Sequence, residues 1–405
     1  MSQPELGALP DVPLGVAVSG GGDSVALLML LYAGGYNICA ATVDHQLRPE
    51  SAQEAAGVAA LCAKFKIPHQ VLVWRNPDIQ GNLQDEARKA RRNLLASWAR
   101  QQRVSDIVLG HTKDDQAETV LMRLARGSGV DGLSGMATKR CADGLCWHRP
   151  MLKIERTELR DYLRHKNIGW VEDPSNDDLK YARIKARKAL EVLAPLGLSM
   201  ARLTETASHM ARARNALETT VLELAQKSVT ISDAGELRIN LTVFQTASTE
   251  VQLRLLAAAL CWVASAGYRP RFNALSGLLE FCLSSVQSGK TLHGCSITRK
   301  KDRIILNREV SATPVLADVT QNWDGRWQIG NPAKHDVQIK ALGEDGILCC
   351  PNWRETGHSR ASLLASPSLW QKDALIAAPF ANIGDKWPVN LAGGKKGFYD
   401  RLITH

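Results

Sequence analysis

The chain has 405 residues, of which 45% are hydrophobic and 22% are charged, and its formal net charge is +9. This composition excludes a disordered or fibrous chain, and the length exceeds what one hydrophobic core usually serves, so we expect two or three globular domains. The basic excess favours a polyanionic partner, although a basic surface that only aids solubility would give the same charge.

The cysteines and the apolar runs indicate the cellular compartment of the protein. Nine cysteines are present and no two have CxxC spacing, which favours a reducing cytoplasm over a metal cluster or a disulfide framework. Residues 1–11 lack the apolar stretch of a signal peptide, and the longest apolar run, 25–32, is too short to span a bilayer. We therefore expect a cytoplasmic protein with no membrane association.

The first half of the chain alternates short apolar runs with amphipathic segments. Strands are predicted at 16–18, 38–43, 70–74 and 106–109, and helices near 24–33, 51–66, 83–103 and 114–125. This alternation is typical of an α/β fold with a doubly wound, mostly parallel sheet, in which ligands bind beyond the carboxyl ends of the strands. Those ends are followed here by Ser19, by Asp44-His45 and by Gly110-His111, so we expect these residues to come together.

The second half has a different pattern. From about 189 to 227 it is helical and charged, and a strand pair at 296–298 and 303–306 flanks a basic turn, Arg299-Lys300-Lys301-Asp302. The tail from Ser311 contains Pro, Gly, Trp and short apolar runs, which predict a small β-rich domain. We therefore divide the chain into an α/β domain at 1–195, a mainly helical domain at 196–310 and a β-rich domain at 311–405.

A strand that runs into three glycines, then Asp-Ser and a helix, predicts a phosphate-binding loop. The residues are Ser19, Gly20, Gly21, Gly22, Asp23 and Ser24. A glycine-rich turn without a ligand is the alternative, but the hydroxyls and the Asp23 carboxylate, which could reach Mg²⁺ at the phosphates, argue against it. A dinucleotide fingerprint would need glycine at Val25, and a Walker A loop ending at Thr291 would need glycine at Ser284.

The SGGGDS loop resembles the SGGxDS loop of the N-type ATP pyrophosphatases, the PP-loop superfamily with an adenine nucleotide alpha hydrolase-like fold. Further motifs are similar to those of the bacterial tRNA(Ile)-lysidine synthetases and occur in that family's order over about 14–196. They are DHQLRPES at 44–51, GNLQ at 81–84, HTKDDQAET at 111–119, RGSGVDGL at 126–133, RPML at 149–152 and EDPSN at 172–176. Weaker matches extend to about 310.

This resemblance implies a ligase that uses ATP and Mg²⁺. Such an enzyme adenylates the 2-carbonyl oxygen of the wobble cytidine in tRNA(Ile) with a CAU anticodon, releasing pyrophosphate, and L-lysine then displaces AMP. The lysidine formed pairs with A, so the tRNA changes from methionine to isoleucine identity. The helical domain would bind tRNA, and the sequence leaves open whether the chain forms a homodimer.

Family position also implies roles for individual residues. Asp23 and Asp115 would hold Mg²⁺ and supply the general base, and His111 would line the same site. Arg91 and Arg187 would contact the ATP phosphates or the flipped-out base. The residues alone leave other interpretations open: Asp114 and Asp115 could only cap a helix, His111 could be a satisfied strand-end histidine, and Arg91 could lie on a solvated face.

Three other functions remain to be weighed. A tRNA thiolase would use the same loop, but it generally needs paired cysteines, and no CxxC pair is present. An amidotransferase ligase would need an N-terminal cysteine nucleophile, whereas Ser2 follows Met1. A non-catalytic tRNA-binding protein would have lost residues such as Asp23, Asp115 and Arg187, which are intact here.

Overall fold

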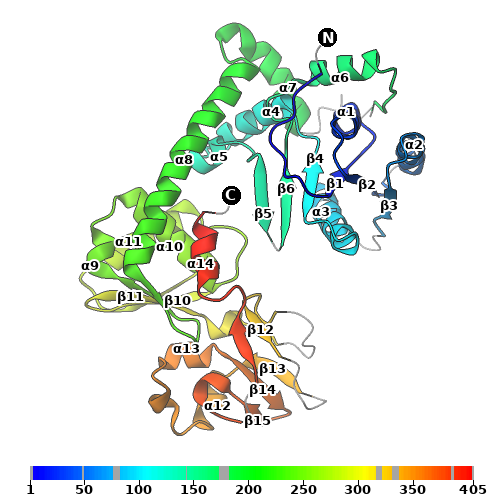
Figure 1. The fold of residues 1–405 in the computed structure, drawn as a ribbon. Coiled ribbons are helices and arrows are strands. Elements are labelled where there is room, and N and C mark those ends of the chain that lie inside the picture. Colours follow the sequence, from blue (N-terminus) through cyan, green and yellow to red (C-terminus); the bar gives the residue numbers. More distant parts are fainter. Residues whose placement is uncertain are drawn as a thin grey trace. The chain divides into compact units, whose positions relative to one another are not determined.

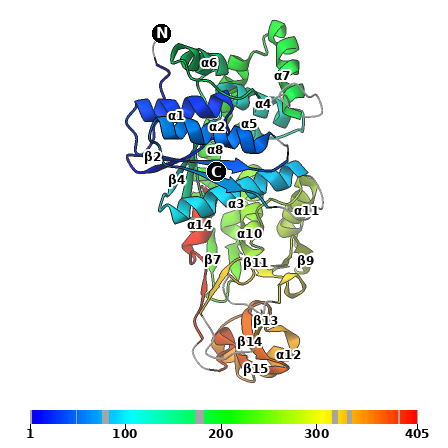
Figure 2. The same ribbon diagram turned by 90° about the vertical axis from the view of Figure 1, so that its right-hand side faces the viewer.

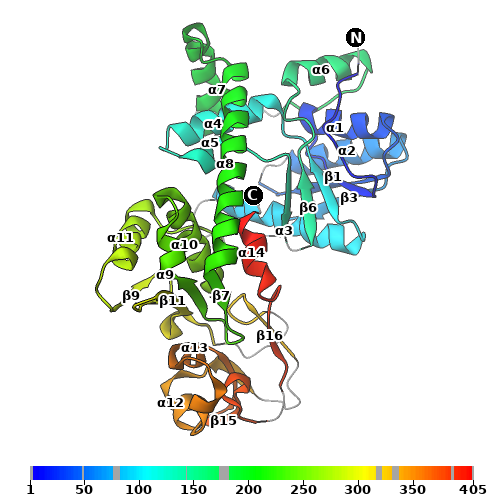
Figure 3. The same cartoon turned by 60° about the vertical axis from the view of Figure 1, so that its left-hand side comes forward.

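The computed structural model describes residues 3–47, 50–75, 83–142, 144–172, 182–315, 322–330, 337–384 and 387–403. The chain forms two compact units, Met1–Arg214 and Asn215–Thr404, which are described separately. Helix α8 (Met200–Ser228), one uninterrupted helix in Figure 3, contains the boundary between them. The three-part division at 195 and 310 stays a prediction. The motif positions 48–49, 81–82 and 173–176 lie outside the described residues.

The first unit is built on a six-stranded sheet with the strand order β3-β2-β1-β4-β6-β5 (Figure 1). All neighbours pair in parallel except β5, which is antiparallel to β6. The predicted mostly parallel α/β fold is therefore confirmed. The strands are β1 (Leu14–Ala17), β2 (Ile38–Asp44), β3 (His69–Val73), β4 (Asp106–Leu109), β5 (Lys139–Ala142) and β6 (Leu145–His148).

Helices cover both faces of this sheet (Figure 2). One hydrophobic cluster joins the sheet to α1, α2 and α6, and a second joins its other face to α3 through Leu95 and Trp98. Because β1 lies between β2 and β4, the strand order reverses there, and such a switch point is where ligands bind in open α/β sheets. The helices are α1 (Gly22–Ala33), α2 (Ser51–Lys64), α3 (Leu83–Gln101), α4 (Lys113–Leu124), α5 (Val130–Leu133), α6 (Arg156–His165) and α7 (Ala182–Leu193).

The second unit contains the rest of α8 and an antiparallel sheet with the order β7-β8-β11-β10-β9. The helical character of this region is confirmed, and so is the strand pair predicted at 296–298 and 303–306, whereas β7, β8 and β9 were not predicted. The elements are β7 (Val229–Ile231), β8 (Leu237–Asn240), α9 (Leu241–Gln245), α10 (Thr249–Val263), α11 (Phe272–Leu283), β9 (Gly289–Leu292), β10 (Cys295–Arg299) and β11 (Arg303–Arg308).

The tail of this unit is rich in strands, as predicted. Strand β12 pairs with β16, and β14 lies between β13 and β15 in a separate sheet. Trp323, Trp327 and Trp387 form the centre of its core. The elements are β12 (Trp327–Ile329), β13 (Gln338–Ala341), α12 (Gly343–Leu348), α13 (Arg360–Leu364), β14 (Pro367–Gln371), β15 (Ala374–Ala377), β16 (Val389–Leu391) and α14 (Lys396–Leu402), with short 3-10 turns at Ala194–Leu196, Val310–Ala312, Trp353–Thr356 and Pro379–Ala381.

One pair of cysteines departs from the expected reduced state. Cys141 and Cys146 are direct cross-strand partners in the β5/β6 hairpin and form a disulfide, with their Cα atoms 4.0 Å apart. The spacing of four intervening residues gave no such signal, because the pairing arises from the hairpin register. Among the described helices, none has the length and apolar character needed to cross a membrane.

Candidate active site

A pocket of about 500 Å³ lies at the carboxyl ends of β1, β2 and β4. Ser19, His45, Gly110 and His111 all line it, so the predicted convergence of the three strand ends is confirmed, although Asp44 itself is not among the lining residues. Helices α3, α6 and α7 contribute Arg91, Arg156, Arg160, Arg183 and Arg187 to its wall. The pocket is therefore rich in guanidinium groups, which suits a polyphosphate ligand.

The glycine-rich loop has a specific geometry. Gly20 has φ +90°, a conformation that favours glycine, and a Cβ on Gly22 would lie 3.3 Å from the Trp170 ring. The Ser24 hydroxyl receives the Ser19 N–H at 3.1 Å and donates to the Gly21 carbonyl at 2.9 Å. The loop closes on itself and places the amino end of α1 at the pocket, where unpaired N–H groups can bind an anion.

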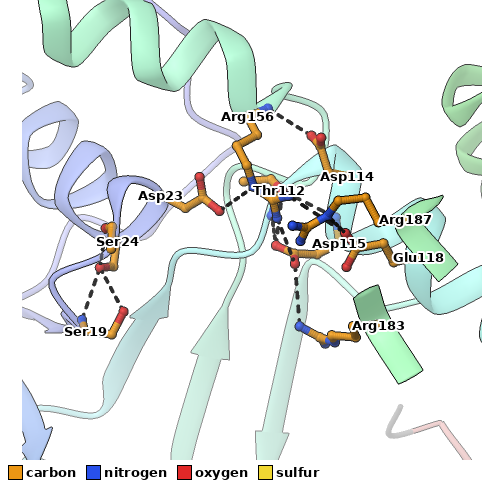
Figure 4. A network of polar contacts seen from close by, with 11 residues as sticks. Ser19, Asp23, Ser24, Thr112, Asp114, Asp115, Glu118, Arg156, Arg183 and Arg187 are labelled. Carbon is orange, nitrogen blue, oxygen red and sulfur yellow. Dashed lines mark hydrogen bonds and ion pairs between the residues drawn. The ribbon is translucent and has the colours of Figure 1, made fainter. Parts of the chain in front are cut away.

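Asp115 serves two structural purposes at once (Figure 4). Its Oδ2 accepts the Thr112 N–H at 2.8 Å and the Thr112 hydroxyl at 3.1 Å, which completes the capping box of α4. Its Oδ1 lies 3.3 Å from Arg156 Nη2 and 3.5 Å from Arg183 Nη1. Although burial raises the pKa of this carboxyl, the Thr112 N–H and the two arginines outweigh burial and hold the pKa below its usual range.

Asp23 lies opposite, at the start of α1. Its Oδ2 accepts a hydrogen bond from Arg156 Nε at 3.0 Å. Burial outweighs this cation and raises the pKa of the Asp23 carboxyl, with smaller contributions from Asp115 and Asp114. The structure thus places Asp23 and Asp115 around one guanidinium, that of Arg156.

Arg187 enters the pocket from α7 and is held from behind by Glu118. The Arg187 Nε lies 2.9 Å from Glu118 Oε1, and the Glu118 side chain is 1% exposed. Glu118 does not line the pocket, and burial raises its pKa. We conclude that Glu118 orients Arg187, while the exposed part of the guanidinium faces the pocket.

His111 and Arg91 are the remaining predicted site residues, and both line the pocket. Burial, together with nearby arginines, lowers the pKa of His111 to about 3, so its imidazole is neutral near pH 7. The pKa of Arg91 is also lowered, by burial and by the charges of Arg88 and Arg183. Arg91 thus faces like charges, an arrangement that a bound anion would relieve.

Every predicted site residue except Gly20 therefore lines this pocket, but three members of its charge network, Arg156, Arg183 and Glu118, were not predicted. Glu118 falls within the HTKDDQAET motif and could have been singled out as an acidic residue one helical turn after Asp115. Arg156 is 133 positions from Asp23 and gave no signal of its own. Asp114 helps to position Arg156, because its Oδ2 accepts the backbone N–H of Arg156 at 2.9 Å.

The donor set fits Mg²⁺ held jointly with a nucleotide. No group of three or more metal-binding side chains occurs within the described ranges. Mg²⁺ in phosphate-transfer sites usually takes one or two carboxylates and completes its shell with phosphate oxygens and water. Asp23 and Asp115 match that pattern.

Comparisons with known proteins place the chain. A family model of the PP-loop domain matches residues 6–193. A tRNA(Ile)-lysidine synthase from Ruegeria pomeroyi is 46% identical over 99% of this chain and 96% of its own length. Another from Wolbachia pipientis wMel is 36% identical over 92% of this chain and 89% of its own.

Among solved structures, the U34-tRNA thiolase NcsA from Methanococcus maripaludis has 16% identity and a TM-score of 0.44, covering 49% of this chain and 72% of its own. A likeness at that level carries no argument about function. Because the two relatives named above match the chain over nearly its whole length, the chain belongs to the tRNA(Ile)-lysidine synthase family.

Proposed function

We propose that this protein ligates L-lysine to C2 of the wobble cytidine of tRNA(Ile) with a CAU anticodon, through an adenylated cytidine. The observation that carries the proposal is the match to tRNA(Ile)-lysidine synthases over 99% of the chain, which includes both compact units and not only the PP-loop domain. The thiolase alternative lacks such support. We also propose a cytoplasmic location, where the tRNA substrate is found.

ATP would lie in the pocket with its phosphates at the loop from Ser19 to Ser24. The amino end of α1 and the guanidinium groups of Arg91 and Arg187 would hold the phosphate charge. Mg²⁺ bound between Asp23 and Asp115 would neutralise charge that develops as pyrophosphate leaves. We therefore assign Ser19, Gly20, Gly21, Gly22, Asp23 and Ser24 to ATP binding.

The chemistry then has two steps. The carbonyl oxygen O2 of cytidine attacks the α-phosphorus of ATP, the bond to the β-phosphate oxygen breaks, and pyrophosphate departs. The deprotonated ε-amino group of lysine then attacks C2, and the former carbonyl oxygen leaves as part of AMP. Because the lysine ammonium must lose a proton first, a carboxylate of the pocket has to accept it, and we assign this step to Asp115.

His111 and the arginines would position these groups. The neutral His111 can accept or donate one hydrogen bond without adding charge next to Asp115. Arg187, fixed by Glu118, and Arg91 would contact the phosphates or the cytidine that leaves the anticodon stack. The region at 196–310 would bind tRNA away from the anticodon.

The proposal is tested by incubating the purified protein with ATP, Mg²⁺, radiolabelled lysine and the tRNA. We expect label in tRNA(Ile) with the CAU anticodon, with AMP and pyrophosphate formed in equal amounts. The elongator methionine tRNA, which has the same anticodon, is the matched control and should stay unlabelled. Sulfur incorporation without lysine incorporation would favour the thiolase and overturn the proposal.

A further inference from the structure

Arg156 bridges the two carboxylates proposed to bind Mg²⁺. Its Nε lies 3.0 Å from Asp23 Oδ2, and its Nη2 lies 3.3 Å from Asp115 Oδ1 (Figure 4). A third nitrogen, Nη1, lies 3.8 Å from Glu118 Oε1, and the side chain is 14% exposed. Within the part of the chain that the structure describes, no other cation forms ion pairs with both Asp23 and Asp115.

The backbone of Arg156 is anchored separately from its guanidinium. Arg156 is the first residue of α6, and its N–H donates to Asp114 Oδ2 at 2.9 Å. The preceding residue, Glu155, forms an ion pair with Lys113 at 2.8 Å. These two contacts hold the start of α6 against the start of α4. The guanidinium itself contacts carboxylates alone among the described residues: Asp23 and Asp115 in the pocket and the more distant Glu118 behind it. It can therefore change partner while the backbone stays in place.

A guanidinium and a divalent cation compete for the same carboxylate oxygens. Two carboxylates that face one site repel each other unless a cation lies between them, and a buried guanidinium in turn needs an anionic partner. When a metal takes Asp23 and Asp115, Arg156 loses its two nearest partners and keeps only Glu118, 3.8 Å away. The phosphates that accompany the metal offer the replacement, because guanidinium pairs with phosphate as well as with carboxylate.

We propose that Arg156 is an exchangeable counter-cation that holds Asp23 and Asp115 in the empty pocket and transfers to the ATP phosphates when Mg²⁺ binds. This inference rests on the proposed function, which assigns Mg²⁺ and ATP to the pocket. Arg156 thereby disfavours metal binding without nucleotide and favours metal binding with it. Mg²⁺ and ATP therefore bind to the pocket together.

The Arg156→Gln variant separates this role from simple structural support. Mn²⁺ serves as the probe, and its affinity for the nucleotide-free protein is measured from the paramagnetic signal of free Mn²⁺. We expect the variant to bind Mn²⁺ about tenfold more tightly, because a competing charge is removed, and to bind ATP with Mg²⁺ about tenfold more weakly, because a phosphate partner is lost. A purely structural residue would change both affinities in the same direction.

Two further variants control the measurement. Arg156→Lys keeps the charge but loses the bidentate geometry, so both changes should be smaller than in Arg156→Gln. Arg202→Gln removes an exposed, ion-paired arginine of the same unit and should leave both affinities unchanged. The thermal unfolding transition shows whether each variant is folded. If Arg156→Gln is not folded, the Mn²⁺ and ATP affinities of Arg156→Lys test the inference instead.

Unchanged or weakened Mn²⁺ binding in a folded Arg156 variant would overturn the inference. The lysine incorporation assay on the unaltered protein reports separately on the proposed function. If lysine is incorporated but Mn²⁺ binding does not tighten, only the role of Arg156 is wrong. If Mn²⁺ binding tightens but lysine is not incorporated, only the proposed function is wrong.

Discussion

Both compact units contain an arginine that is largely shielded from solvent, but the two arginines have different partners. In the first unit, Arg156 contacts the carboxylates of Asp23 and Asp115 at the wall of a pocket. In the second, Arg326 donates to the backbone carbonyls of Val263 and Gly235 at 3.1 and 2.8 Å. Its guanidinium also lies 4.6 Å from the Trp262 ring and 5.5 Å from the Trp327 ring.

Arg156 and Arg326 differ in role because one contacts carboxylates and the other contacts backbone carbonyls. Backbone carbonyls in a core have no other ligand to bind, so Arg326 is a permanent link between β12 and the α10 region. Carboxylates at a pocket can exchange an arginine for a metal, so the contacts of Arg156 belong to one state of the site. We therefore expect changes in the pocket to affect the reaction and changes at Arg326 to affect stability.

The largest effect is expected at Asp115. Asp115→Asn should reduce lysine incorporation by at least about a thousandfold, because the amide cannot take a proton from lysine or bind the metal strongly. The amide oxygen can still accept from Thr112, so the capping box and the free energy of unfolding should change little. Asp115→Ala would remove the cap as well and cost roughly 1 kcal/mol more. Asp161→Asn, at an exposed carboxylate, is the control; a fully active Asp115→Asn protein would refute the assignment.

Arg326→Met tests whether Arg326 contributes to stability and not to ATP binding. The substitution leaves two buried carbonyls without their donor and removes the contact with two tryptophans, so the free energy of unfolding should fall by about 3 kcal/mol. ATP affinity in the first unit should not change. Urea unfolding and ATP titration measure the two quantities. Normal stability, or a loss of ATP affinity in a folded variant, would show that the division of roles is wrong.

The pH dependence of stability sharpens the account of the pocket. The pKa of His111 is lowered to about 3 in the folded protein, below the ordinary value near 6.5, so only the unfolded state binds this proton at intermediate pH. The contribution of His111 to the free energy of unfolding is therefore fully present above about pH 6.5. It is lost as the pH falls towards 3, by up to about 1.4 kcal/mol per pH unit. His111→Gln should lose less stability between about pH 7 and about pH 5. His209→Gln, at an exposed position, should behave like the unaltered protein; equal slopes for all three would contradict a neutral buried His111.

The smallest effect is expected at the basic turn of 299–303. In this turn Arg299 is buried with its Nε bonded to the Cys282 carbonyl, and Arg303 pairs with Asp302 at 2.7 Å. Only Lys300 and Lys301 of its cations are left for tRNA. Replacing both with Gln should lower the salt dependence of tRNA binding by at most about two phosphates. An unchanged slope would place the tRNA elsewhere.

The sequence predicted the parts of the fold that have a periodic pattern. Strands β1, β2 and β4 are buried on both faces and are therefore apolar, and the helices between them follow turn signals. The β5/β6 hairpin was missed because β5 is the half-exposed edge segment KRCA, which has no apolar alternation. The Cys141–Cys146 disulfide was missed with it.

The site residues were predictable where they fall in motifs, and the contacts between them were not. Capping and active-site roles for Asp115 were weighed as alternatives, whereas the structure gives one carboxylate oxygen to the cap and the other to the pocket. The position of Arg156 depends on how α4 and α6 meet in space, which no local pattern encodes. Glu118 was within a motif but lies behind Arg187, which only the packing of α4 on α7 reveals.

The central claim is that the cytidine carbonyl oxygen becomes part of AMP. It is tested most directly with tRNA(Ile) that carries oxygen-18 at O2 of the wobble cytidine, incubated with the protein, ATP, Mg²⁺ and lysine. Mass spectrometry of the released AMP should show one oxygen-18 atom for each lysine incorporated. Unlabelled AMP alongside lysine-modified tRNA would contradict the adenylated intermediate and the account built on it.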